Sequence, residues 1–93
     1  NNLNDEEKKG QRLVNVKFSY TVKIADFYFK DTAIMMLKRI KTESPVRNPK
    51  IEKITNKKYR VYLGPFNNIN SLQKSYNDIS ILAFENIEII KND

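Results

Sequence analysis

The fold is decided by residues 59–66, YRVYLGPF, because an earlier stretch of the chain repeats their pattern. The earlier stretch is residues 20–27, YTVKIADF, and it begins 39 residues before the later one. Both carry apolar side chains at alternate positions, which is the period of a half-buried β-strand. Each is followed by apolar residues at helical spacing. The 93-residue chain therefore contains two similar strand–helix–strand units.

Two helices and four strands are predicted from these units. The strands are expected at residues 16–24, 50–55, 59–63 and 87–90. The first helix ends before Ser44-Pro45, since the residue preceding proline disfavours helix, and its apolar stripe consists of Ala33, Met36, Leu37 and Ile40. The second helix begins at an N-cap, Asn67 or Asn68, and its stripe consists of Ile69, Leu72, Tyr76 and Ile79. The order βαββαβ predicts an α+β, ferredoxin-like domain with a four-stranded antiparallel sheet and both helices on one face.

One face of this sheet has no helix to cover it. Alternation directs Val22, Ile24, Val61 and Leu63 toward the helices, and it directs Thr21, Lys23, Arg60 and Tyr62 to the opposite face. The two halves are related by approximate twofold symmetry, which places the first and third strands side by side at the centre. Lys23, Arg60 and Tyr62 should then cluster. This face is either simply solvated or a binding surface on which the ring of Tyr62 stacks against a ligand.

Composition excludes several classes of function. The chain has no Cys, His or Trp, which excludes disulfides, thiolate zinc sites and histidine bases. We find no catalytic motif and expect no enzyme activity, metal or cofactor. The carboxylates of Asp26, Asp31, Glu52 and Glu88 are interpreted as solvated. Phe27, Phe29 and Phe66 follow strands and are expected to pack in the core or at a hinge.

Net charge is +6, which favours a polyanion, an acidic membrane surface or a polar surface polymer as partner. Residues 1–15 have three acidic and three basic side chains, so their charges cancel, and we predict a largely disordered linker before a domain at 16–93. No apolar window is long enough for a transmembrane helix. Because the chain starts at Asn, we expect it to be a piece of a longer protein.

RNA-recognition modules use the same sheet and stack bases on aromatic side chains of the central strands. Their third-strand signature has two outward aromatics and an early glycine. Here only Tyr62 points outward, and Gly64 is placed differently. Single-stranded RNA binding therefore stays as the alternative function, and a purely structural interaction domain is a third.

Residues 59–66 resemble the third-strand motif of SPOR domains, the sporulation-related repeat family, which runs y-R-V-x-v-G-P-F. Residues 22–27, followed by Ala33 and Leu37, are similar to the family's first-strand pattern v-Q-v-G-x-F and A-x-x-x-L. The resemblance covers residues 18–91. Lys23 stands where the family usually has Gln, and Ala25 stands where it usually has Gly.

This resemblance implies a non-catalytic, monomeric module of the bacterial cell envelope, in the periplasm, that binds peptidoglycan and no nucleic acid. Family members bind glycan strands lacking stem peptides at the division septum, and they occur on cell-division proteins and on rare lipoprotein A. Their membrane attachment lies in other segments. The family's glycan lies on the open sheet face, which makes Thr21, Lys23, Arg60 and Tyr62 the candidate ligand-binding residues. Lys23 and Arg60 could bind lactyl carboxylates, and Tyr62 could stack on a sugar.

Overall fold

The computed structural model describes residues 17–93. The predicted linker at residues 1–15 lies outside the described residues. The observed order is βαββαβ, and the strands form one antiparallel sheet in the order β3-β4-β2-β5. The predicted α+β, ferredoxin-like fold is confirmed, with β2 and β4 at the centre. The elements are β2 (Tyr20–Phe27), α1 (Lys30–Glu43), β3 (Lys50–Thr55), β4 (Lys58–Phe66), α2 (Ile69–Ser80) and β5 (Glu88–Lys91).

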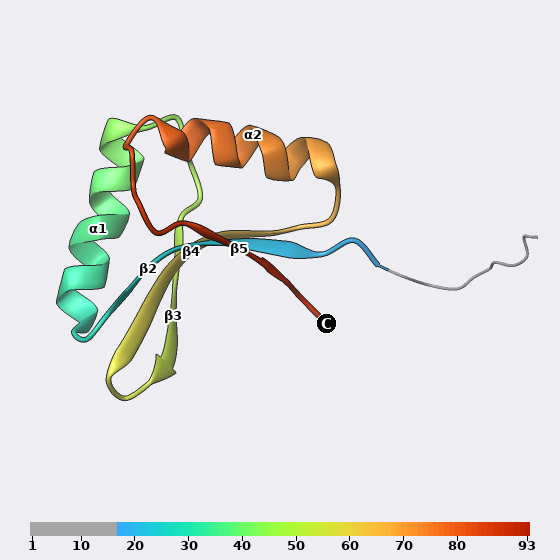
Figure 1. Ribbon diagram of the computed structural model, residues 1–93. Coiled ribbons are helices and arrows are strands. Elements are labelled where there is room, and N and C mark those ends of the chain that lie inside the picture. Colours follow the sequence, from blue (N-terminus) through green and yellow to red (C-terminus); the bar gives the residue numbers. More distant parts are fainter. Residues whose placement is uncertain (1–16) are drawn as a thin grey trace, which may run out of the picture.

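Both helices lie on the same side of the sheet, and the hairpin of β3 and β4 extends away from α2 (Figure 1). The core lies between the helices and the central strands, and its buried apolar residues are Val22, Ile24, Ala33, Ile40, Val46, Val61, Leu63, Leu72 and Ile79. The predicted burial of Val22, Ile24, Val61 and Leu63 is therefore confirmed. Burying each of the larger side chains contributes about 1.5–3 kcal/mol.

The helices begin and end close to their predicted positions. Asn68 is the N-cap of α2, and its side-chain oxygen accepts a hydrogen bond from the backbone N–H of Ser71 at 2.9 Å. The predicted stripe on α2 was partly wrong, because Ile69 is 57% exposed and Tyr76 is 40% exposed. The side of α2 that faces the sheet runs instead through Leu72, half-buried Ser75 and Ile79.

The first strand begins later than predicted. Its pairing starts at Tyr20, which is opposite Phe66 on β4 and Lys91 on β5, and both of those strands end there. At its other end the strand continues to Phe27, which packs against the core as Phe66 does. Phe29 does not pack as predicted, because it lies in the connection to α1 and is 64% exposed.

Each central strand contains one irregularity in its pairing. On β2, Lys23 is opposite Tyr62 and Ala25 is opposite Val61, so Ile24 is an extra residue and forms a β-bulge. On β4 the shift lies at Gly64 and Pro65, which are joined by a cis peptide bond, and Gly64 has a φ of 104°. The bulge on β2 reverses the alternation of the strand, so that Asp26 lies opposite Arg60.

Candidate ligand-binding face

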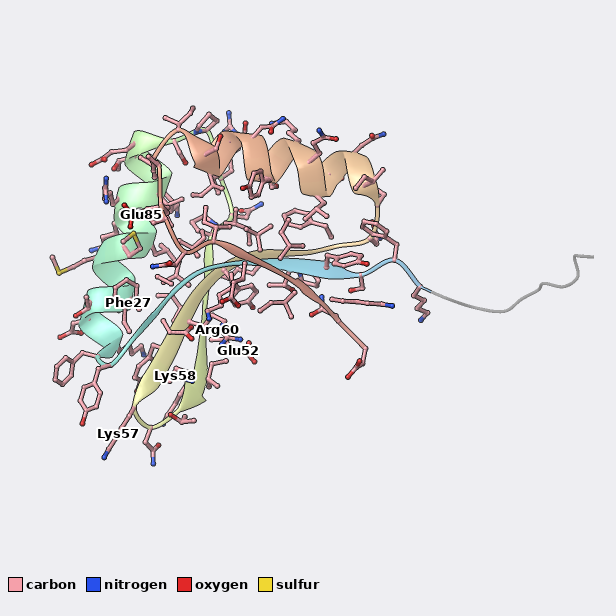
Figure 2. The ribbon with its side chains drawn as sticks, in the orientation of Figure 1. Phe27, Glu52, Lys57, Lys58, Arg60 and Glu85 are labelled. Atoms are coloured by element: carbon pink, nitrogen blue, oxygen red, sulfur yellow. The ribbon has the colours of Figure 1, made fainter. Side chains whose placement is uncertain are left out.

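The face of the sheet opposite the helices, called the open face below, is organised in two rows of charged and aromatic side chains. Strand register sets the rows, because residues opposite one another on neighbouring strands have adjacent side chains. Figure 2 shows Arg60 and Glu52 on the side of the sheet away from the helices. The first row is Lys50, Tyr62, Lys23 and Glu88, and the second row is Glu52, Arg60 and Asp26.

Asp26 is the centre of an ion-pair network. Its carboxylate accepts two hydrogen bonds from Arg60, from Nε at 2.9 Å and from the second guanidinium nitrogen at 3.1 Å. The ammonium of Lys23 lies 3.5 Å from Asp26 and 3.6 Å from Glu88. The Asp26, Arg60 and Lys23 side chains are only 20–23% exposed, so this paired geometry is partly shielded from water. The network fixes the position of the guanidinium.

The network also shifts the acid–base equilibria of both partners. The hydrogen bond from Arg60 lowers the pKa of Asp26, with help from the nearby positive charges, although partial burial opposes the shift. The same hydrogen bond raises the pKa of Arg60. Both groups are therefore charged across the physiological pH range.

Tyr62 is the aromatic residue of the first row. It is half-buried and has a lysine opposite it on each neighbouring strand, Lys50 on β3 and Lys23 on β2. The ammonium of Lys50 donates a hydrogen bond to the carbonyl oxygen of Gly64 at 2.8 Å. A ring between two cations on an uncovered face can stack on a flat ligand surface while the ammonium groups bind polar atoms at its edge.

Thr21 lies two residues before Lys23 on β2 and belongs to a separate polar cluster. Its hydroxyl accepts a hydrogen bond from Nδ2 of Asn92 at 3.0 Å and donates to Oδ1 at 3.3 Å. The amide of Asn92 also donates to the hydroxyl of Ser19 at 3.2 Å. The structure therefore brings Lys23, Arg60 and Tyr62 together, whereas Thr21 is engaged with the C-terminal residues.

Asp26 is the main site residue that sequence reasoning missed. The interpretation of Asp26 as a solvated carboxylate was wrong, since the structure pairs it with Arg60 and Lys23. Strict alternation would place it on the core side with Val22 and Ile24, where an unpaired carboxylate is costly. A charged residue at a core-facing position and an apolar residue, Phe27, at the next outward-facing position together signalled a shift of phase in the strand. This pattern in the sequence could have indicated the bulge.

The two rows together contain three cations and three carboxylates, so the centre of the open face has no net charge. Beside it lies a hollow of about 300 Å³, bordered by Lys23, Asp26, Glu85 and Glu88.

Among residues 17–93, no cluster of acidic side chains is suited to hold a metal ion. None of the helices in the described part is long and apolar enough to cross a membrane.

We compared the chain with protein-family models, curated proteins and solved structures, and no match was found in any of the three comparisons.

Proposed function

We propose that this chain is a non-catalytic peptidoglycan-binding module, which recognises glycan strands lacking stem peptides and directs a parent protein to the bacterial division septum. The observation that carries the proposal is the first row of the open face, where Tyr62 lies between Lys23 and Lys50 beside the Arg60–Asp26 pair. This arrangement supports a ligand that is flat and polar and that carries only spaced negative charges.

Charge balance is the first argument for a glycan. A sugar chain offers hydroxyl and amide groups, which need both donors and acceptors. Arg60 has five N–H donors and uses two of them on Asp26, while the carboxylate of Asp26 keeps lone pairs beyond those two hydrogen bonds. A pair whose geometry is already fixed can present these groups with little further loss of conformational freedom.

The position of the lysines is the second argument. Removal of the stem peptide leaves a carboxylate on each lactyl group of the strand. Lys23 lies 3.5 Å and 3.6 Å from its carboxylate partners, which is looser than the 2.9 Å contact of Arg60, so its ammonium can turn to a ligand. We therefore assign carboxylate binding to Lys23, stacking to Tyr62, and hydroxyl binding to Arg60 and Asp26. Lys50, whose ammonium donates to the carbonyl oxygen of Gly64 at 2.8 Å, borders the ring of Tyr62 on the other side. An open surface of this kind suits micromolar affinity, about −8 kcal/mol.

Single-stranded RNA binding is the competing proposal, and Tyr62 on a central strand is the feature that favours it. The three carboxylates of the open face balance its three cations, so the face offers little net attraction to a phosphate backbone, and this disfavours RNA. The two ligands differ in salt response, because RNA binding weakens steeply as salt rises.

The test is retention of the protein on purified sacculi, either intact or treated with an amidase that removes the stem peptides. We expect stronger retention on the treated sacculi, and loss of retention for Tyr62→Ala. Tyr76→Ala is the matched control, since Tyr76 is 40% exposed on α2, on the other side of the sheet. Equal retention on both preparations would contradict specificity for denuded strands. Binding of an RNA oligomer that collapses with added salt would support the competing proposal.

A further inference from the structure

A pair of exposed aromatic residues lies at one end of the sheet. Tyr28 is 56% exposed and Phe29 is 64% exposed, and their rings pack edge to face with centroids 4.7 Å apart. They connect β2 to α1, where the backbone of Phe29 caps the helix. The pair is held by its own contact and by the helix end, yet much of both rings faces solvent. Large exposed apolar groups side by side indicate an interaction surface.

The same end of the sheet carries an excess of positive charge. Phe27 is opposite Tyr59 on β4, and Lys53 on β3 is opposite the same tyrosine. The tip of the β3–β4 hairpin therefore lies next to the aromatic pair, and Figure 2 shows Lys57 and Lys58 at this tip. We define the hairpin-end patch as Tyr28, Phe29, Lys30, Lys53, Lys57 and Lys58.

All four lysines of the patch are exposed, and among residues 17–93 none of them forms an ion pair. Two carboxylates directly adjoin the patch in sequence, Asp31 after Lys30 and Glu52 before Lys53, and Glu52 belongs to the second row of the open face. The centre of the open face differs, since its cations and carboxylates balance. Four exposed lysines without an ion-pair partner among residues 17–93 therefore belong to the same patch as two exposed rings.

We propose that the hairpin-end patch docks on a lipid bilayer that contains anionic headgroups. Aromatic side chains favour the boundary between headgroups and acyl chains, and lysines near an anionic surface are attracted to it. The patch consists of six residues, whereas a stable protein interface takes roughly 20–30 residues and 800 Å² on each partner. Exposed aromatic rings beside lysines without ion-pair partners instead match the chemistry of a peripheral membrane contact.

Docking at this end leaves the open face accessible. Lys58 and Tyr62 are four residues apart on β4, which is roughly 13 Å at the usual rise of a strand. The proposal rests on the exposed rings and the lysines alone, so it is independent of glycan binding. If both proposals hold, the module could bind a bilayer and an adjacent polymer at the same time.

The experiment is co-sedimentation of the full chain with vesicles of phosphatidylcholine, with and without phosphatidylglycerol. We expect binding only when phosphatidylglycerol is present, and weaker binding as salt rises. Loss of one lysine should weaken binding about fivefold, so the double variant Lys57→Gln, Lys58→Gln should lose about 25-fold. Phe29→Ala should lose about tenfold, because part of the ring no longer enters the interface.

Two matched controls lie at the opposite end of the central strands. Ile69→Ala removes an apolar side chain that is 57% exposed, just after the end of β4, and Lys91→Gln removes a lysine opposite Tyr20. Neither should change vesicle binding, and thermal melts should show all variants folded. Absence of binding, equal binding to both kinds of vesicle, or equal losses in controls and patch variants would overturn the proposal. So would dimerisation of the free protein that Phe29→Ala abolishes, since it would assign the rings to a second copy.

Discussion

The two central strands carry the same pattern 39 residues apart, but their pairing irregularities are built from different residues. On β2 the bulge is followed by Asp26, which it turns onto the open face beside Arg60. On β4 the equivalent place holds Gly64 and Pro65, which add no charge. One irregularity therefore supplies a carboxylate to the site, and the other only shapes the backbone. Two halves of similar architecture thus form an asymmetric site.

The largest expected effect on the free energy of unfolding comes from a substitution at one of these two irregularities. Gly64→Val should destabilise the fold by about 3 kcal/mol, because residues other than glycine rarely adopt a backbone φ of 104°. A Cβ there would also lie 3.0 Å from ring atoms of Phe66. The equivalent change on β2, Ala25→Gly, should cost about 0.5–1 kcal/mol. Denaturant titration measures both, and a Gly64→Val variant within about 0.5 kcal/mol of the parent would contradict this difference.

The second prediction concerns the ion pair that only the β2 bulge makes possible. Arg60→Ala should destabilise the fold by about 1.5–3 kcal/mol, since it leaves the carboxylate of Asp26 with the weaker contact to Lys23 alone. A double-mutant cycle with Asp26→Ala should give a coupling free energy of about 1–2 kcal/mol. Additive effects of the two changes would show that the pair contributes nothing to stability.

The third prediction is a pH dependence with a defined sign. The pKa of Asp26 is lowered below its ordinary value of 3.8, so the folded state binds the proton of this group less readily than the unfolded chain does. Its stabilising contribution is complete above about pH 5 and is lost as the pH falls through 3.8 toward the folded pKa.

Asp26→Asn isolates this contribution from that of the other carboxylates. The difference in unfolding free energy between the parent and the variant should be constant from pH 5 to pH 7, at about 1–2 kcal/mol, and should shrink as the solution becomes more acidic. Chemical denaturation at several pH values gives this difference. A difference that grows on acidification would contradict the direction of the shift.

Much of the fold could be predicted from the sequence, because it depends on local periods. Alternation identified Val61 as core and Tyr62 as outward-facing, and Asn68 signalled the start of α2. The position of Asp26 could not be read from a strict period of two, because a bulge is a property of the pairing between strands. The exposure of Phe29 was missed because a hydrophobic residue does not reveal whether a helix or strand of the fold packs against it.

The role of Tyr62 is the central claim, and calorimetric titration with a glycan oligomer lacking stem peptides tests it most directly. Tyr62→Ala should change the free energy of unfolding by only about 1 kcal/mol, since the side chain is half-buried on the open face and lies outside the core. It should weaken glycan binding about tenfold, the scale of one stacking contact, whereas Tyr76→Ala should bind as the parent does. Unchanged affinity in a folded Tyr62→Ala variant, or an equal loss in Tyr76→Ala, would contradict glycan binding on the open face.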